Sequence, residues 1–189
     1  DLSRRETLRG GLARPTGIVC SGADLFVLET AGHAIWYLRG DGRTGTFGRR
    51  GEGNGEFNYP AAIAAFANIL LVGDTLNFRV QELDARSGSH VRSFGRLGDA
   101  AGETPRIKGI GVDAEGRVWL TDALLDQVSL YSQEGTYLMS LGGTGSDPGT
   151  FRFPAGVAGH PAGRVAVVDS LGRRVQVFRL VAMGETGGR

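Results

Sequence analysis

The sequence predicts an all-β fold, a β-propeller of four-stranded antiparallel blades, with about four blades in 189 residues. Two observations lead to this prediction. A block of about 40–50 residues recurs four times, and repeats of this length that form four short strands are typical of propeller blades. Within each block apolar residues alternate with period two, and the breaks are Gly, Asp, Ser and Asn, as in strands joined by tight turns. We therefore predict one propeller segment over residues 1–189, with blades at about 14–58, 59–104, 105–152 and 153–189.

The blocks share fixed spacings that align them. In every block an acidic residue is followed nine positions later by a bulky residue, at Glu29 and Leu38, Asp74 and Leu83, Asp122 and Tyr131, and Asp169 and Phe178. The bulky residue that ends a block lies thirteen positions before the proline position of the next, from Phe47 to Pro60, Phe94 to Ile107 and Leu141 to Pro154. Ile107 therefore occupies the proline position of the third block, and Pro105 is displaced from it.

The first block illustrates the four strands expected in each blade. A strand of small residues over 17–20 is followed by strands over 25–28, 34–38 and 44–47. Small residues suit the first strand, because the inner edges of the blades crowd together around the channel of a propeller. Turns over 39–42, 85–88 and 133–135 are expected to close the hairpins between third and fourth strands.

The two ends of the sequence do not fit whole blades. Leu2 lies thirteen positions before Pro15, which places Leu2 at the end of an outer strand of a preceding blade. The outer strand of the fourth block is expected to end at about 187–189, but the tail over 184–189 has no bulky residue there. We therefore expect the fourth blade to lack its outer strand, and we expect a partner chain, or sequence outside these residues, to cover the open blade edges, because unpaired strands promote aggregation.

Two segments resemble the NHL repeat, in which a strand ending in Asp is followed by Asn-x-Arg, then Ile or Val, then Gln. They are residues 74–81 and 165–178, and residues 149–154 are similar to the NHL linker into the next blade. Since NHL rings usually close with about six blades, the resemblance implies an incomplete arc of a six-bladed ring. The first block departs most from the motif, because Glu29 replaces the Asp and Gly32-His33-Ala34 replaces Asn-x-Arg.

The composition is that of an ordinary globular chain, with 41% hydrophobic residues, 22% charged residues and a net charge of +1. The near-neutral charge argues against DNA binding, and no apolar run is long enough for direct membrane insertion. Cys20 is the one cysteine, which excludes an intrachain disulfide and a CxxC metal site. The sequence begins at Asp1 without an initiator Met, as in a processed or trimmed chain.

Four acidic residues recur where the second strand of each block ends, and a ring of carboxylates can hold a cation. We favour instead a structural role, in which each carboxylate accepts hydrogen bonds from backbone N–H groups or from an arginine at the following turn. These structural turn acids are Glu29, Asp74, Asp122 and Asp169. Asp74 with Arg79 and Asp169 with Arg174 are the expected pairs.

Three histidines raise the question of a zinc site, because the peptide-amidating lyase is an NHL-like propeller whose metal is held by histidines of separate blades. His33 is expected in the turn after a second strand, His90 at the start of an outer strand, and His160 in a first-to-second turn. These positions differ in radius and face, so we predict three surface histidines and no metal, cofactor or catalytic residue. Lactonase-like chemistry is disfavoured, because the asparagines do not recur at one position of the repeat.

Polar loop residues on one face are the candidate binding residues. They are Arg49, Arg50, Asn77, Arg79, Arg173 and Arg174. Tripartite-motif NHL proteins bind RNA on a basic face, so the resemblance implies RNA binding as one alternative. RNA is disfavoured because aromatic residues suited to base stacking are sparse and because acids share these loops. These acids are Glu52, Glu56, Asp99 and Glu103.

From these observations we predict a non-catalytic protein-binding or scaffold subunit of a multiprotein assembly. Its expected partners are other protein subunits that cover the loop face or the open blade edges. Family analogy and the processed start imply a bacterial, extracytoplasmic protein, either periplasmic or at the cell surface. The alternatives are an RNA-binding NHL domain and a segment of a propeller enzyme, amidating-lyase-like or lactonase-like, whose catalytic blades lie outside this chain.

Overall fold

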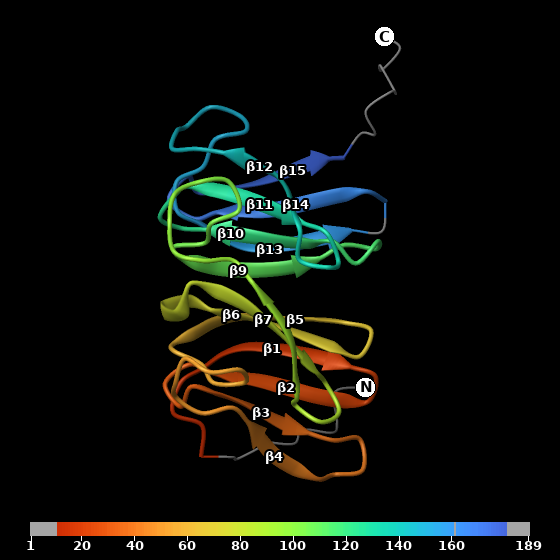
Figure 1. Cartoon of the computed structure of the whole chain (residues 1–189). Coiled ribbons are helices and arrows are strands. Elements are labelled where there is room, and N and C mark those ends of the chain that lie inside the picture. The colour runs from red at the N-terminus through yellow and green to blue at the C-terminus, as the bar shows by residue number, and fades with distance from the viewer. Residues whose placement is uncertain (1–10, 161, 181–189) are drawn as a thin grey trace.

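The structure, a computed structural model, describes residues 11–160 and 162–180. Its strands form four antiparallel sheets, and one short 3-10 helix, η1 (Thr75–Asn77), connects the second and third strands of the second sheet (Figure 1). Blade 1 contains β1 (Pro15–Ser21), β2 (Asp24–Glu29), β3 (Ala34–Leu38) and β4 (Thr44–Phe47); blade 2 contains β5 (Pro60–Phe66), β6 (Ile69–Asp74), β7 (Arg79–Asp84) and β8 (His90–Phe94); blade 3 contains β9 (Ile107–Val112), β10 (Val118–Asp122), β11 (Gln127–Tyr131) and β12 (Tyr137–Gly142); blade 4 contains β13 (Pro154–His160), β14 (Arg164–Asp169) and β15 (Arg174–Arg179).

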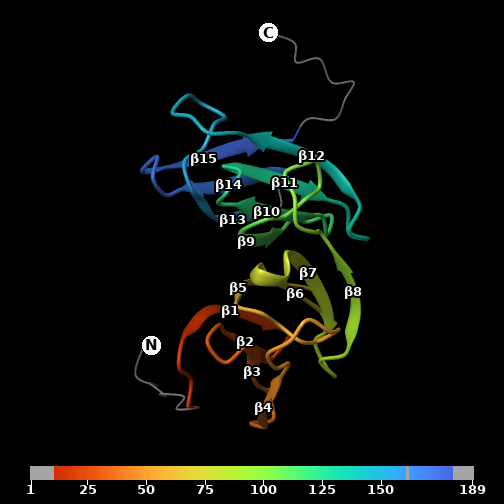
Figure 2. The same ribbon diagram turned by 60° about the vertical axis from the view of Figure 1, so that its left-hand side comes forward.

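The blades follow one another along an arc, with blades 1 and 4 at its two ends (Figure 1, Figure 2). In each sheet the strands pair with their neighbours in sequence order. The first strand of each blade contacts the first strand of the next, so β1, β5, β9 and β13 form the inner edge of the arc. This arrangement is that of a β-propeller, and it confirms the predicted fold class.

The strands of blade 1 lie where the alternation of apolar residues places them. β3 and β4 have the predicted bounds, whereas the β1–β2 ladder is longer than predicted and runs from Pro15 paired with Glu29 to Ser21 paired with Asp24. Ile107 begins β9 just as a proline begins the inner strand of each other blade. The structure thus confirms that Ile107 fills the proline position of the third block.

Blade 4 differs from the others in its number of described strands. Three strands are described in blade 4, whereas blades 1, 2 and 3 each have four. The expectation for Leu2, and that of an outer strand ending at about 187–189, fall outside the described residues.

The hydrophobic core lies between successive blades. Each sheet has an outgoing face, which packs against the next blade, and an incoming face, which packs against the preceding blade. Burial of apolar side chains between these faces is the main favourable term in the stability of the arc. Phe26, Leu28 and Ile35 of blade 1 meet Ile63, Leu70 and Val72 of blade 2; Leu71 and Val80 of blade 2 meet Ile110, Val118 and Leu120 of blade 3; Trp119, Val128 and Leu130 of blade 3 meet Val165 and Val167 of blade 4.

Small residues in the inner strands let the blades approach closely. A Cβ atom at Gly111 would lie 2.6 Å from the carbonyl oxygen of Val157 in the next blade. A Cβ atom at Gly17 would lie 2.9 Å from a methyl group of Ile63. The clash at Gly111 is with backbone, which cannot turn aside as a side chain can, so the crowded inner edge requires glycine there.

Polar contacts also tie one blade to the next. His33 Nδ1 accepts a hydrogen bond from the N–H of Tyr59 at 3.1 Å, and Asp126 Oδ1 accepts one from the N–H of Phe153 at 2.7 Å. His33 and Asp126 occupy the same repeat position, four residues after the turn acid, and both have left-handed backbone, with φ of 55° and 51°. Since Tyr59 and Phe153 directly precede β5 and β13, the turn of one blade positions the inner strand of the next.

Candidate functional site

The turn acid of blade 2 is a buried hydrogen-bond acceptor. Asp74 accepts the backbone N–H of Asn58 at 2.6 Å and the side-chain amide of Asn77 at 2.9 Å. It also accepts Nε of Arg79 and Nε2 of Gln81, each at 3.0 Å. The carboxylate has no solvent exposure, so the Asp-Asn-x-Arg-x-Gln pattern supplies the donors that offset its burial.

The other turn acids hold the linkers of their own blades in the same way. Each is buried and accepts a backbone N–H that lies one or two residues before its inner strand. The contacts are Glu29 with Arg14 at 2.8 Å, Asp122 with Arg106 at 2.8 Å, and Asp169 with Arg152 at 2.7 Å. Asp169 also pairs with Arg174 at 2.8 Å, so both predicted ion pairs are present. The oxygens of these acids bind within their own blades rather than converging on one point.

The Asp169 carboxylate makes the stability of the fold depend on pH. Burial alone would raise its pKa, but the N–H of Arg152 and the guanidinium of Arg174 outweigh burial and hold the pKa below its ordinary value. A carboxylate with a lowered folded pKa stabilises the fold above its unfolded pKa of about 3.9, and this contribution is lost as pH falls through the folded pKa. We expect Asp169→Asn to destabilise the protein at neutral pH and progressively less in acid. Urea unfolding along a pH series measures this difference.

Ser170→Ala, a neutral change in the same turn, is the control for that prediction. Its effect should be independent of pH, because no titrating group is lost. A constant difference between Asp169→Asn and the parent protein from neutral to acid pH would contradict the prediction.

Several of the predicted binding residues are engaged in holding the linkers. The guanidinium of Arg79 donates to the carbonyls of Gly53 at 2.7 Å and Glu56 at 3.2 Å, in addition to Asp74. Arg174 donates in the same manner to the carbonyls of Ser146, Asp147 and Thr150 in the linker before blade 4. The amide of Asn77 donates to the carbonyl of Gly51 at 2.8 Å.

The remaining three candidates are exposed and lie in two separate places. Arg49 pairs with Glu56 at 2.7 Å in the linker between blades 1 and 2, and Arg50 is exposed beside it. Arg173 is exposed in the turn of blade 4. The six candidates therefore form one group on the linker and turn of blade 2 and another on blade 4.

A different basic group lies at the mouth of the channel. The loop face is the face that carries the turns at 30–33, 75–78, 123–126 and 170–173. A hollow of about 520 Å³ opens on this face across blades 1, 2 and 3. Arg14, Arg106 and Lys108 line it together with Tyr59 and Leu76. We call this hollow the channel mouth.

The channel mouth has an uncompensated positive charge. All three basic residues are exposed, and no carboxylate among the described residues lies within ion-pair distance of their side chains. The turn acids beneath Arg14 and Arg106 bind the backbone N–H groups of these residues, which leaves the guanidinium groups free to face the hollow. A concave surface lined by one sign of charge attracts the opposite charge.

Sequence reasoning did not select these three residues. Arg14 and Arg106 both stand directly before the first residue of an inner strand, and Lys108 is the second residue of β9. That shared position was the signal available in the sequence. It was obscured because Tyr59 and Phe153 fill the same position in blades 2 and 4.

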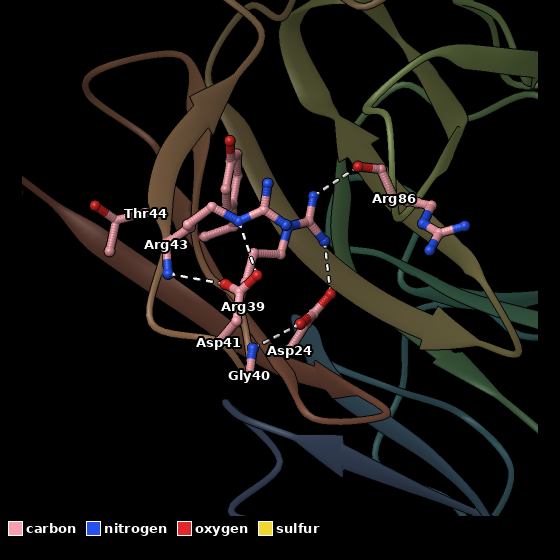
Figure 3. Close-up of a pocket in the computed structure, with 8 residues that line it drawn as sticks. Asp24, Arg39, Gly40, Asp41, Arg43, Thr44 and Arg86 are labelled. Atoms are coloured by element: carbon pink, nitrogen blue, oxygen red, sulfur yellow. Dashed lines mark hydrogen bonds and ion pairs between the residues drawn. The ribbon is translucent and has the colours of Figure 1, made fainter.

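A larger hollow, of about 660 Å³, lies on the opposite face (Figure 3). Its central residue is Arg39, whose guanidinium stacks 4.3 Å from the ring of Tyr37, pairs with Asp24 at 2.7 Å and donates to the carbonyls of Ala85 and Arg86. These contacts hold a turn of blade 1 against a turn of blade 2. Arg39 pairs with Asp24 and Arg43 with Asp41, so Arg86 is the one charged lining residue without an ion pair among the described residues, and this hollow is the poorer candidate for a charged ligand.

The structure corrects the prediction for one histidine. His33 is buried rather than on the surface, because Tyr59 of the next blade covers it, with ring centres 4.7 Å apart. His90 begins β8 as expected, whereas His160 is the last residue of β13 rather than part of the turn that follows it. Within residues 11–160 and 162–180, no three His, Cys, Asp or Glu side chains are placed to hold a metal ion together. The described part of the chain also contains no helix long and apolar enough to span a membrane.

Comparison with known proteins finds two curated relatives, while no family model matches the chain. The chain is 29% identical over 135 residues to Protein brain tumor of Drosophila melanogaster, covering 70% of this chain and 12% of that protein. It is 38% identical over 76 residues to RING finger protein nhl-1 of Caenorhabditis elegans, covering 40% of this chain and 8% of that protein. The chain thus spans only a small part of each relative. Both are animal proteins, which gives no support to a bacterial origin.

Among solved structures, the chain is similar to a catalytically inactive virginiamycin B lyase from Staphylococcus aureus with quinupristin. The TM-score is 0.67 at 13% identity, covering 96% of this chain and 62% of that one. This likeness shows the propeller fold alone. The curated relatives indicate the type of repeat. In blades 2 and 4 the linker is held by the Asp-centred turn that the NHL motif describes. The chain is therefore a β-propeller whose repeats are similar to those of NHL-repeat proteins.

Proposed function

We propose that the chain is a non-catalytic protein-interaction module whose channel mouth binds an acidic segment of a partner protein. The observation that carries the proposal is the cluster of Arg14, Arg106 and Lys108, three exposed cations without a carboxylate partner among the described residues. Charged groups placed in a concavity raise both the association rate and the selectivity for a ligand of opposite charge.

The mouth also offers apolar contacts next to the charges. Tyr59 and Leu76 are 43% and 47% exposed at its rim. Arginine binds carboxylates with two parallel hydrogen bonds, so the cations suit Asp and Glu of a peptide. The tyrosine and the aliphatic side chain beside them suit an apolar residue of the same peptide. The backbone beneath is held by the turn acids, so binding requires little ordering of the site.

The curated relatives support a propeller of the interaction type. One of them is named a RING finger protein, and the region similar to this chain is only 8% of it. Membership in a multiprotein assembly and an extracytoplasmic location remain predictions from the sequence. RNA is the competing ligand, since a basic surface also attracts phosphates. We favour protein because Tyr59 is the one exposed aromatic residue among the described residues that line the mouth, which is a small platform for base stacking.

A binding titration tests the proposal. A fluorescein-labelled Glu- and Asp-rich peptide containing one Leu is titrated with the protein and followed by fluorescence anisotropy. We expect saturable binding that weakens with added salt. Arg106→Glu and Lys108→Glu should each raise the dissociation constant at least tenfold, about 1.4 kcal/mol, because each reversal places a negative charge against the peptide.

Arg43→Glu is the matched control, because Arg43 is exposed beside the hollow on the opposite face. It should leave peptide binding unchanged. Equal weakening by all three substitutions would mean that net charge, not the channel mouth, determines binding. Tighter binding of a single-stranded RNA oligonucleotide, lost in Arg106→Glu and Lys108→Glu, would replace protein by RNA as the ligand.

A further inference from the structure

The turns of blades 2, 3 and 4 each present an exposed leucine on the loop face. Leu76, Leu124 and Leu171 lie two residues after the turn acids of their blades, and they are 47%, 61% and 60% exposed. Blade 1 has the small Ala31 at this position. A single exposed leucine needs no explanation, but the same exposure at one repeat position of three successive blades marks an interaction surface. We call Leu76, Leu124 and Leu171 the leucine row.

The backbone of the leucine row is held by hydrogen bonds, although its side chains are exposed. The N–H of Leu76 donates to the carbonyl of Asn58 at 3.0 Å, and the N–H of Leu171 donates to the carbonyl of Arg152 at 3.0 Å. The N–H of Leu124 donates to the turn acid of blade 3 at 2.8 Å. A partner therefore meets three leucines at fixed positions, and binding requires little ordering of this surface.

The leucine row lies beside the cations of the channel mouth. Leu76 and Leu124 line the same hollow as Arg14, Arg106 and Lys108. The cations stand at the beginning of inner strands, whereas the leucines follow second strands, which lie farther from the channel in each sheet. The loop face therefore has cations on its inner side and leucines on its outer side.

Two neighbouring sides of different character suit an extended chain, because its successive side chains point in opposite directions. Acidic residues at alternate positions would face the cations, and apolar residues between them would face the leucines. Packed sheets lie about 10 Å apart and the blades spread outward from the channel, so leucines of neighbouring blades lie farther apart than that. Residues four positions apart in an extended chain are about 13 Å apart and point to the same side, which suits this spacing.

We propose that the channel mouth and the leucine row together bind one extended acidic segment of a partner protein, with an apolar residue at every fourth position. The inference rests on the proposed function and adds the conformation, the path and the sequence pattern of the ligand. A lipid surface is the competing partner, because leucines beside cations also suit an anionic membrane. A peptide is favoured because the cations line a hollow, which a single chain can enter and a flat bilayer cannot.

Two peptides of equal charge, followed by fluorescence anisotropy, test the proposal. Both have Asp or Glu at every second position; one has three leucines at every fourth position, and in the other Ser replaces the two outer leucines. The three-leucine peptide should bind more tightly by about tenfold or more, because it buries more apolar surface. Leu171→Ser should weaken its binding by about fivefold. Binding of the one-leucine peptide should not change in this variant, because Leu171 is not among the residues that line the hollow.

Leu138→Ser is the matched control, because Leu138 is an exposed leucine in the outer strand β12, next to a turn on the opposite face. It should leave the binding of both peptides unchanged. Both leucines are exposed, so circular dichroism should show an unchanged fold in either variant.

Arg106→Glu, measured with both peptides, separates this inference from the proposed function. If Arg106→Glu weakens both peptides but Leu171→Ser weakens neither, the channel mouth binds acidic segments without the leucine row, and this inference alone is overturned. If neither peptide binds, the proposed function fails as well. Sedimentation with phosphatidylserine vesicles that is lost in Leu171→Ser, without saturable peptide binding, would replace the peptide by a lipid surface.

Discussion

Asp74→Ala is expected to lower the free energy of unfolding by about 3–5 kcal/mol, the range found when one partner of a buried ion pair is removed. The substitution leaves Arg79 unpaired and the N–H of Asn58 and the amide of Gln81 short of an acceptor. In the described part of the chain every buried side-chain nitrogen and oxygen has a hydrogen-bond partner. The substitution would leave buried donors without an acceptor, which is costly because they have also lost their contacts with water. Urea unfolding followed by tryptophan fluorescence measures the change.

The control for Asp74 is Asp41→Ala, which removes an ion pair of similar length. Asp41 contacts Arg43 at 2.8 Å, but both side chains are largely exposed, so water replaces the lost contact and stability should not change measurably. If the two substitutions had equal effects, Asp74 would not organise the turn as described. Asp74→Asn should fall between the parent protein and Asp74→Ala, because its carbonyl oxygen can still accept from Asn58.

Trp119→Ala is expected to lower the free energy of unfolding by about 3–5 kcal/mol, the usual cost of removing a large aromatic side chain from a core. Trp119 is 1% exposed and packs between blades 3 and 4 with Val165 and Val167. Its indole Nε1 donates to Asp113 at 3.1 Å. The cavity would lie at a blade interface, so the loosening should be confined to blades 3 and 4. Urea unfolding gives the magnitude, and hydrogen exchange of β10 and β14 gives the location.

Trp119→Phe separates packing from the hydrogen bond. Phenylalanine keeps most of the apolar contact, and Asp113 retains Arg117 as a partner at 2.8 Å. Its effect should therefore be well below that of Trp119→Ala. Increased exchange in β2 and β6 of Trp119→Ala, equal to that in β10 and β14, would show that the cavity is not confined to this interface.

The sequence predicted the blades because the repeat is local. The nine-residue spacing from Asp74 to Leu83 spans the turn after β6 and most of β7, and the structure builds this unit in every blade. The ion pairs of Asp74 with Arg79 and of Asp169 with Arg174 were predictable for the same reason, since only five residues separate the partners.

The channel mouth could not be predicted in this way. Arg14 and Arg106 are distant in sequence, and only the curvature of the arc brings both to one hollow. The burial of His33 was missed because it depends on Tyr59, a residue of the next blade. Arg79 was predicted to bind a partner, but its donors reach the linker carbonyls of Gly53 and Glu56, which no spacing rule anticipated. The contacts that the sequence did not predict lie between repeats rather than within them.

The hydrogen bonds from Tyr59 to His33 and from Phe153 to Asp126 have a consequence for cooperativity. They join only adjacent blades, as the apolar interfaces do, so the arc behaves as a one-dimensional array with nearest-neighbour coupling. An interior blade is held from two sides and a terminal blade from one. Among the described blades, local stability is therefore expected to rise from blades 1 and 4 toward blades 2 and 3, and any further blade packed against blade 1 or blade 4 would stabilise that end of the array.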